Sequence, residues 1–509
     1  MASTKRFAFN VMMNWAAMAV GMAIPFFLTP FVVRSLGATA YGIWILAVST
    51  VSYLGILDLG LRSAIIRFVS KAEAQGNPQE ARSSISAALW FRILISSCVV
   101  VLSLILALAF PHLFKIPAGM ERAAQITVLL CALGVAITLV SGVFGAVLAA
   151  ISRFDVLSSV SMGQALARAC GVILILRSGR GLISLAWWEF TVILLSGLVT
   201  SGVALKIFPT ARVRVARPDT KTLKNIWNYS LTTFIMIVST QVIVNTDNLV
   251  VGAMLSVAVV SFYSIGSSLM TYSGQVVSAL STTFTPLASS LEASGRTEDL
   301  QRLLLRGTQA TLGLALPISL TLLLRGKTFI GLWMGPQYSE ISGTVLQILI
   351  ISQFFNVANT TAGMIMMAID KHKTVAKWLS AEAALNFGLS LVLVKVIGIY
   401  GVAWGTSAVV VVIHLIFWPR YVRTTLGVPI KRYLWEGWTG ITLCSIPFAL
   451  ACAAADHYWH PHSLVEFFSQ VALTLPVYAI SVLIFFREEA GNILAQWRSS
   501  RAATSQAAS

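Results

Sequence analysis

The sequence predicts an all-α protein that crosses a membrane about 14 times, and three observations support this prediction. Hydrophobic residues make up 57% of the 509 residues and charged residues only 11%, whereas about 25% of the residues of a soluble protein are charged. The apolar residues form runs of about 20, the length of a helix that spans a bilayer. The basic residues gather in short segments between these runs, as topology signals do.

The apolar runs predict the spans in chain order. The first run follows Lys5 and Arg6 and is about 25 residues long. The apolar region of a cleaved signal peptide has about 7–15 residues, so we expect a retained first helix. The predicted spans are 9–33, 42–66, 84–110, 123–148, 157–176, 182–205, 227–252, 257–288, 303–324, 343–367, 376–394, 401–419, 437–455 and 465–486.

The distribution of Lys and Arg predicts that both termini are cytoplasmic. In this orientation the cytoplasmic segments, counted with the first turns of adjoining spans, hold 25 of the 36 basic residues, and the opposite side holds eight. Such a positive-inside bias also requires an even number of spans. The net charge of +17 is then explained by topology signals and by contacts with anionic membrane lipids, and no nucleic-acid partner is expected.

The longest loop between spans, 206–226, carries six basic residues and divides the first six spans from the next six. We therefore predict an N-terminal six-helix lobe over 1–205, a basic cytoplasmic linker over 206–226 and a second six-helix lobe over 227–419. An extra C-terminal helix pair over 420–486 and a disordered cytoplasmic tail over 487–509 complete the prediction.

A set of short motifs within residues 28–90 resembles a known family. The motifs are Arg34-x-Leu36-Gly37, Tyr41-Gly42-x-Trp44, Leu57-Asp58-x-Gly60-Leu61 and Arg67. With them the chain resembles the Wzx-type oligosaccharide flippases, in the superfamily that also holds multidrug exporters and the peptidoglycan-precursor flippase. The core of that superfamily lacks the last two spans predicted here. In some flippase branches such a pair is proposed to form a groove for a lipid tail.

The resemblance implies a fold, a substrate and a location. The fold is two six-helix lobes around a central cavity with alternating access. The substrate is a lipid-linked oligosaccharide, usually on undecaprenyl pyrophosphate, and polysaccharide polymerase machinery is an implied partner. The protein is then a multi-pass protein of the bacterial inner (cytoplasmic) membrane.

Charged residues inside spans are the first candidates for a site, because each costs about 2.5–3.5 kcal/mol at a helix centre on insertion scales. Arg62, Arg92 and Arg168 lie at similar depth in the cytoplasmic half of the first lobe. Arginine matches the oxygens of a pyrophosphate bidentately. We hypothesise that Arg92 and Arg168, which have no acid at i±3 or i±4, bind the substrate headgroup.

Asp58 and Arg62 are an i,i+4 pair, so we expect Asp58 to hold Arg62 at the rim of this pocket. Two alternatives stay open. One is that the two charges simply neutralise each other, and the other is that Arg62 extends to the cytoplasmic interface. Glu189 in the sixth span is a further candidate acid.

Polar residues also occur in the second lobe. Asp247 follows Gln241 and Asn245 in the seventh span, and Glu382 lies in the eleventh. Such residues could bind a coupling ion, a proton or sodium, or sugar hydroxyls; hydrogen bonding between helices is the alternative.

Two prolines, Pro25 and Pro30, interrupt the first span. Proline kinks a helix, so we predict a hinge for alternating access at this point, and static shape-fitting is the alternative.

Other chemistries find little support in the sequence. The five cysteines form no CxxC pair, so neither a disulfide framework nor a zinc site is predicted. His457, His460 and His462 have spacing that could bind a metal, but we assign no metal and no cofactor. No nucleotide-binding or hydrolase motif occurs in a usable context.

Two alternatives to a flippase remain. A multidrug or organic-cation antiporter of the same superfamily is less favoured, because three arginines in one lobe suit an anion. A membrane glycan polymerase or ligase usually needs a large extracytoplasmic loop, and no outer loop here exceeds about 20 residues. We therefore expect a carrier and not an enzyme.

Overall fold

The computed structural model describes residues 2–216 and 220–486, and these residues fold into helices without a β-strand. Twelve helical segments of this part are long and apolar enough to cross a membrane. The all-α polytopic class is confirmed, with fourteen as an approximate count. The first of the twelve segments, Met12–Ala74, contains two predicted spans, and the helix at the eighth predicted span is not among them. The tail over 487–509 lies outside the described residues.

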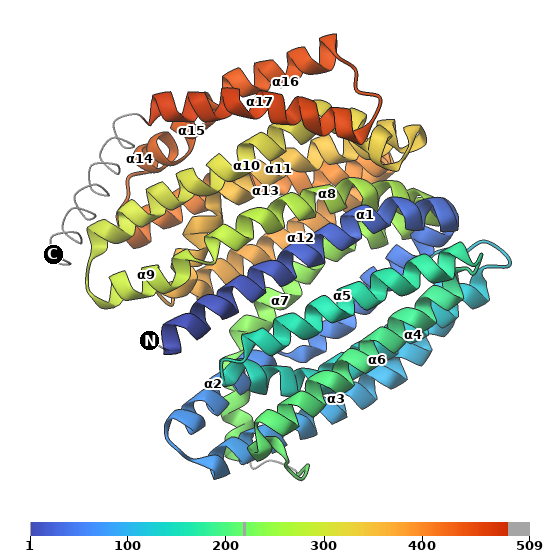
Figure 1. Cartoon of the computed structure of the whole chain (residues 1–509), viewed down its shortest axis with the longest axis vertical. Coiled ribbons are helices and arrows are strands. Elements are labelled where there is room, and N and C mark those ends of the chain that lie inside the picture. The colour runs from blue at the N-terminus through green and yellow to red at the C-terminus, as the bar shows by residue number, and fades with distance from the viewer. Residues whose placement is uncertain (1, 217–219, 487–509) are drawn as a thin grey trace. The chain divides into compact units, whose positions relative to one another are not determined.

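The helices form two compact units, Met1–Ile265 with Ala376–Thr406, and Gly266–Val375 with Ser407–Ser509. The predicted lobe boundaries stay predictions. The first unit contains α1 (Ala2–Ser52), η1 (Tyr53–Asp58), α2 (Leu61–Ala74), α3 (Pro78–Leu113), α4 (Glu121–Ala150), α5 (Phe154–Arg177), α6 (Leu182–Ile207), η2 (Pro209–Ala211), α7 (Thr220–Met254), the start of α8 (Val257–Ser281), most of α12 (His372–Ile397) and the start of α13 (Ile399–Leu426), which Figure 1 traces by colour.

The second unit contains the rest of α8 and α13 and the helices near the C-terminus. These are α9 (Phe284–Ala293), α10 (Thr297–Met334), α11 (Pro336–Ala368), α14 (Ile430–Arg432), η3 (Tyr433–Thr439), α15 (Gly440–Cys444), α16 (Ile446–Tyr458) and α17 (Leu464–Phe485). Within this unit α16 and α17 lie side by side, as Figure 1 shows in red.

The second predicted span, 42–66, is not a single helix. The first helix continues through a kink at Gly37 (φ 79°, ψ 164°) into this region and ends at Ser52. After η1, Leu59 (φ 52°) and Gly60 (φ 71°) adopt left-handed backbone conformations, and α2 begins at the next residue. Apolar composition predicts that a segment lies in lipid, but it does not report backbone torsion angles. The prediction of one continuous helix is therefore wrong here.

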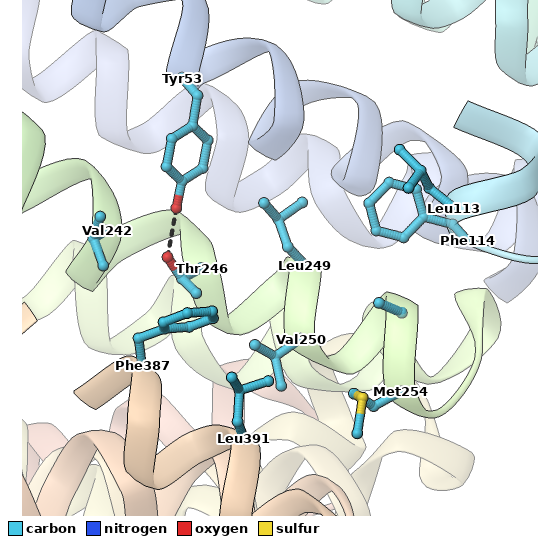
Figure 2. A pocket seen from close by; sticks show the side chains of 11 residues that line it. Tyr53, Leu113, Phe114, Val242, Thr246, Leu249, Val250, Met254, Phe387 and Leu391 are labelled. Carbon is cyan, nitrogen blue, oxygen red and sulfur yellow. Dashed lines mark hydrogen bonds between the residues drawn. The ribbon is translucent and has the colours of Figure 1, made fainter. Parts of the chain in front are cut away.

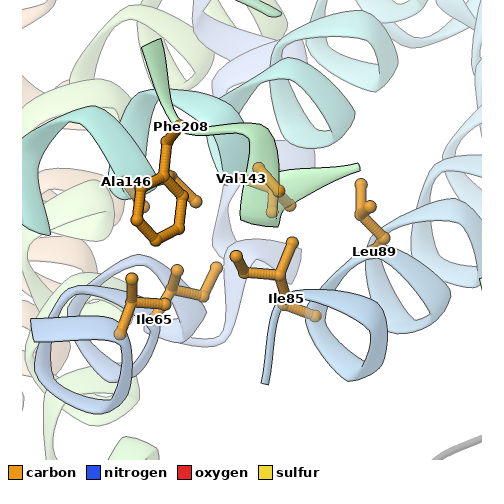
Figure 3. Close-up of a cluster of buried hydrophobic side chains, with 10 residues drawn as sticks. Ile65, Ile85, Leu89, Val143, Ala146 and Phe208 are labelled. Atoms are coloured by element: carbon orange, nitrogen blue, oxygen red, sulfur yellow. The ribbon is translucent and has the colours of Figure 1, made fainter. Parts of the chain in front are cut away.

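A buried apolar cluster joins α2, α3, α4 and the chain that follows α6 (Figure 3). Its buried members are Ile65, Val69, Ile85, Ala88, Leu89, Val143, Ala146, Val147, Phe208 and Ala211. The hydroxyl of Ser70 donates to the carbonyl oxygen of Ala150 (2.9 Å), which adds a polar link between α2 and the end of α4. The cluster fixes one end of this helix group.

The start of the basic linker is held against α3. The hydroxyl of Ser86 donates to the carbonyl oxygen of Arg214 (2.7 Å) and accepts from the backbone N–H of Ala216 (3.2 Å). The predicted linker 206–226 overlaps the end of α6 and the start of α7, and its residues 217–219 lie outside the described residues.

A buried arginine connects the C-terminal helices to α10 within the second unit. The side chain of Arg325 is fully buried, and its Nε donates to Asp456 Oδ1 at the end of α16 (3.2 Å). A second guanidinium nitrogen donates to the amide oxygen of Gln470 on α17. The guanidinium also lies over the ring of Phe467, 4.7 Å from its centroid. Three contacts with α16 and α17 therefore stabilise one charge of α10.

Candidate functional site

Asp58 and Arg92 form an ion pair in the first unit. Arg92 lies on α3 with a side chain only 2% exposed, and its NH2 group contacts Asp58 Oδ1. Asp58 is the last residue of η1, immediately before the two left-handed residues. Two expectations are therefore wrong: Asp58 does not hold Arg62, and Arg92 has an acid partner. The i,i+4 argument fails because the helix is interrupted between Asp58 and Arg62.

Arg62 has a different environment from Arg92. It is exposed on α2, and it makes no ion pair with any residue in the described ranges. It lies close enough to Arg92 for the two positive charges to repel each other. The repulsion favours a geometry in which Arg92 turns to Asp58 and Arg62 turns outward.

Arg168 and Glu189 form the second ion pair inside the spans. Nε of Arg168 donates to Glu189 Oε2 (2.7 Å), and NH2 donates to Oε1 (2.5 Å), so the contact is bidentate between α5 and α6. Arg168 has no acid at i±3 or i±4 on its own helix, and its acid partner comes from the next helix. The Arg168 side chain is 39% exposed and Glu189 15%, so a ligand could reach this arginine but not the buried Arg92.

The helix contact beside this pair is close. The indole N–H of Trp188 donates to the carbonyl oxygen of Ala167 (3.1 Å). A Cβ added at Gly171 would lie 1.9 Å from the Trp188 ring. Only glycine fits there, and the tight packing holds α5 and α6 at the separation that the Arg168–Glu189 contact requires.

The predicted polar cluster of α7 divides into two parts. Gln241 donates from Nε2 to the carbonyl oxygen of Ser52 (2.8 Å), and Asn245 donates from Nδ2 to Gln241 Oε1 (2.8 Å). The carbonyl of Ser52 is at the end of α1, where a helix leaves its last acceptors without internal partners. Gln241 thus provides a donor for a backbone carbonyl at the end of α1, and Asn245 hydrogen bonds to Gln241.

Asp247 belongs to a separate buried network. Its Oδ2 accepts from the hydroxyl of Tyr263 (2.5 Å) and from Oγ1 of Thr406 (2.7 Å). Asn386 on α12 donates from Nδ2 to the same Thr406 oxygen (3.1 Å). Within the described part of the chain, Oδ1 of Asp247 and Oδ1 of Asn386 are buried without a hydrogen-bond partner. Two oxygen acceptors next to this network are thus free for a proton or a small cation.

A cavity of about 490 Å³ lies beside this part of α7 (Figure 2). Its lining is almost entirely apolar, except that the hydroxyl groups of Tyr53 and Thr246 are hydrogen bonded (2.5 Å). The apolar residues are Leu113, Phe114, Val242, Leu249, Val250, Ala253, Met254, Phe387 and Leu391. Thr246 lines the cavity while its neighbour Asp247 points to Tyr263 and Thr406, so one turn of α7 serves both features.

Comparison with known proteins assigns the family. The profile described as "Polysaccharide biosynthesis protein" matches residues 7–292, and the profile described as "MatE" matches residues 233–392. The chain belongs to the polysaccharide biosynthesis protein family. This assignment agrees with the resemblance of its early motifs to the Wzx-type flippases of the multidrug/oligosaccharidyl-lipid/polysaccharide exporter superfamily.

Two curated relatives match most of the chain. "Uncharacterized membrane protein EpsK" of Bacillus subtilis (strain 168) is 25% identical over 438 residues, 83% of this chain and 84% of that protein. "Putative O-antigen transporter" of Shigella flexneri is 23% identical over 401 residues, 77% of this chain and 92% of that protein.

Solved structures show the same fold. The lipid II flippase MurJ in an inward closed conformation superposes with a TM-score of 0.70 at 16% identity, covering 94% of this chain and 99% of MurJ. An inward-facing multidrug transporter of the MATE family gives a TM-score of 0.61 at 15% identity, covering 81% and 98%. These neighbours support the two-lobed helical fold that the sequence predicted.

The structure also places the remaining predicted residues of this chain. Pro25 and Pro30 both lie inside the continuous part of α1, and the non-helical residue is Gly37. Glu382 is buried on α12, one turn before Asn386. The three histidines near the start of α17 are not part of any group of three metal-binding side chains among the described residues.

Sequence reasoning missed Tyr263, Asn386 and Thr406, the partners of Asp247. The spacing of Glu382 and Asn386 by four residues was a usable signal, because it places two polar side chains on one face of an apolar helix. Thr406 and Tyr263 gave no signal in the sequence, since single hydroxyl groups are common in membrane helices.

Proposed function

We propose that this flippase moves a lipid-linked oligosaccharide, carried on undecaprenyl pyrophosphate, across the bacterial inner membrane by alternating access. The observation that carries the proposal is the half-exposed Arg168 inside a membrane-spanning helix. A pyrophosphate presents oxygens that a guanidinium binds as well as it binds a carboxylate. The headgroup would exchange with Glu189 for Arg168, so that the guanidinium keeps an anionic partner at every stage while Glu189 is released.

In this exchange the substrate competes with an acid that is already bound to the arginine. Both arginines have acids, so the resting protein stores no strain that substrate relieves. Arg92 is buried with Asp58 and takes a structural role, and exposed Arg62 is the second cation available to the headgroup. A carrier of this kind needs no cofactor and makes no covalent change to its substrate, which supports a transporter and not an enzyme.

The buried network of Asp247 is the proposed coupling site. Its unpartnered oxygen and that of Asn386 suit a proton or a sodium ion. We expect Asp247→Asn to keep the folded amount and to lose the dependence of export on the ion gradient. Export by this variant at the wild-type rate and with the wild-type ion dependence would exclude Asp247 as the coupling residue.

A multidrug or organic-cation antiporter is the second candidate function. It would need an accessible acid for a cationic drug, whereas Asp58 and Glu189 each already hold an arginine. The phenotype of a deletion strain distinguishes the two candidate functions. A flippase predicts that a lipid-linked sugar accumulates on the cytoplasmic leaflet and that plasmid-borne wild-type protein clears it. Drug sensitivity without such accumulation would support the antiporter.

The proposed orientation places both termini and the basic linker in the cytoplasm. Ala118 and Arg214 are exposed and lie in loops assigned to opposite sides. After replacement of the native cysteines, of which Cys98 and Cys170 are exposed, single cysteines at 118 and 214 should be labelled from opposite sides of the membrane. Labelling of both from one side would contradict this topology. Polysaccharide polymerase machinery on the outer side is the proposed partner.

A further inference from the structure

A second cavity of the first unit lies between α1 and α5. Its lining residue Ala169 follows Arg168 in the sequence, but neither Arg168 nor Glu189 lines it. Its volume is about 310 Å³. Seven apolar residues and one cation line it, namely Ala23, Ile24, Phe27, Leu28, Phe31, Ala169, Ile173 and Arg177. We call this cavity the α1–α5 slot. Its apolar part follows α1 across Pro25 and Pro30, the predicted hinge.

The cation of the slot, Arg177, has no ion-pair partner among the residues that the structure describes. Arg177 is the last residue of α5, its side chain is exposed, and it forms no ion pair within residues 2–216 and 220–486. The partial negative charge at the C-terminus of a helix is only about half an elementary charge, so it stabilises a cation less than a full anion does. This arginine is therefore available to an anion at the membrane surface.

The order of apolar and charged residues along the slot indicates the class of ligand. Ala169, Ile173 and Arg177 follow each other at intervals of four residues on one face of α5. Apolar surface thus leads along one helix face to a guanidinium at the helix end. A molecule that fits has a hydrocarbon chain in the slot and a phosphate at its end, because arginine binds phosphate oxygens bidentately.

We propose that the α1–α5 slot binds an anionic phospholipid of the leaflet that faces the C-terminal end of α5. One acyl chain fills the slot beside Pro25 to Phe31, and the lipid phosphate binds Arg177. The site differs from the Arg168–Glu189 pair in residues and ligand, so it does not depend on the proposed substrate. A bilayer lipid is the chosen occupant because it is present at far higher concentration than any lipid-linked carrier.

The test uses the full chain in nanodiscs of phosphatidylethanolamine with a small fraction of phosphatidylglycerol that bears a photoreactive group on one acyl chain. After irradiation, peptides are mapped by mass spectrometry. We expect labelling of 23–31 and 169–177. Arg177→Gln should lower it about fivefold, the contribution of one basic residue at a membrane surface. Arg180→Gln is the matched control, because Arg180 is exposed at the same helix end but does not line the slot, and it should leave labelling unchanged.

A second variant tests the apolar part. Ala169→Trp fills the slot and should abolish labelling while Arg177 is retained. Three results would overturn the proposal: equal labelling by a photoreactive phosphatidylcholine, equal labelling of the Arg177→Gln variant, or labelling that undecaprenyl phosphate removes and excess phosphatidylglycerol does not. The last result would assign the slot to an isoprenoid carrier. Because the readout is lipid labelling, failure of the flippase proposal would leave it unchanged.

Discussion

The two arginine–acid pairs of the first unit have the same chemistry and different surroundings. Arg92 and Asp58 join α3 to the end of η1, and the arginine is 2% exposed. Arg168 and Glu189 join α5 to α6, and the arginine is 39% exposed. A buried pair cannot exchange partners without leaving a charge in a low-dielectric setting, whereas an exposed pair can. The position of an arginine in the membrane therefore does not by itself identify it as a candidate for substrate binding. The accessibility of its side chain to a ligand must also be known.

The largest expected loss of stability follows removal of Arg92. Arg92→Ala leaves Asp58 without its partner inside the protein, and loss of one member of a buried pair costs about 3–5 kcal/mol. We expect little folded protein in membranes and a much lower Tm in detergent. The double variant Asp58→Asn with Arg92→Met should recover most of the folded amount, since it leaves no charge behind. Normal abundance of Arg92→Ala would show that the pair is not structural.

A smaller loss is expected at the helix contact that supports the other pair. Gly171→Ala places a methyl group against Trp188, which must move, and overpacking of this kind costs about 1–3 kcal/mol. We expect a lower Tm and weaker export, because α5 and α6 separate at the Arg168–Glu189 contact. Gly163→Ala is the control, since a Cβ at Gly163 on the same helix meets nothing within 4 Å. Equal effects of the two variants would contradict the role of the close contact.

Substitution of Arg168 should lower export far more than it lowers the stability of the protein. Because the Arg168 side chain is partly exposed, the pair should contribute less to stability than a buried one, and we expect Arg168→Ala to change stability by about 1 kcal/mol or less. Export should be lost, and Arg168→Lys should restore only part of it, because an ammonium lacks the bidentate geometry. Arg153→Ala is the matched control: Arg153 also pairs with an acid, Asp155 (2.9 Å), but in the turn between α4 and α5. Full export by Arg168→Ala would remove the main support for headgroup binding.

The smallest expected effect on stability is at Arg62. It is exposed and has no ion-pair partner in the described residues, so Arg62→Gln should change stability by about 0.5 kcal/mol or less. The informative measurement is export at limiting substrate. A reduced rate that recovers at higher expression of the substrate pathway would make Arg62 the second headgroup cation. An unchanged rate under limitation would leave Arg168 as the sole candidate.

The sequence predicted what depends on local composition and missed what depends on backbone geometry. The membrane class, most span positions and the family followed from apolar runs, basic loops and the Leu57-Asp58-x-Gly60-Leu61 motif. The partner of Asp58 could not be predicted, because the left-handed Leu59 breaks the helix on which the i,i+4 rule depends. A positive φ at leucine has no signal in the sequence, although Gly60 beside it is a residue that tolerates such a turn.

The polar residues of α7 also show which features local composition predicts and which depend on the tertiary structure. Asp247 stood out because a buried acid is rare in an apolar helix. Its neighbours Gln241 and Asn245 were grouped with it by proximity in sequence, yet they bind the end of α1 while Asp247 binds Tyr263 and Thr406. Asp247 lies two positions after Asn245 and six after Gln241, so it faces a different direction on the helix, and only the tertiary structure assigns each face its partner.

The arrangement around Arg325 has a consequence for biosynthesis. Its two polar partners, Asp456 and Gln470, lie 131 and 145 residues later in the chain. At a synthesis rate of about 5–20 residues per second, the ribosome therefore needs roughly 7 to 29 seconds to produce them after Arg325 has been added to the chain. During this interval the guanidinium cannot reach its final environment and must stay near the membrane surface or the insertion machinery. Release of the chain before α17 would leave α10 in that state, so the last helix acts as the step that completes insertion.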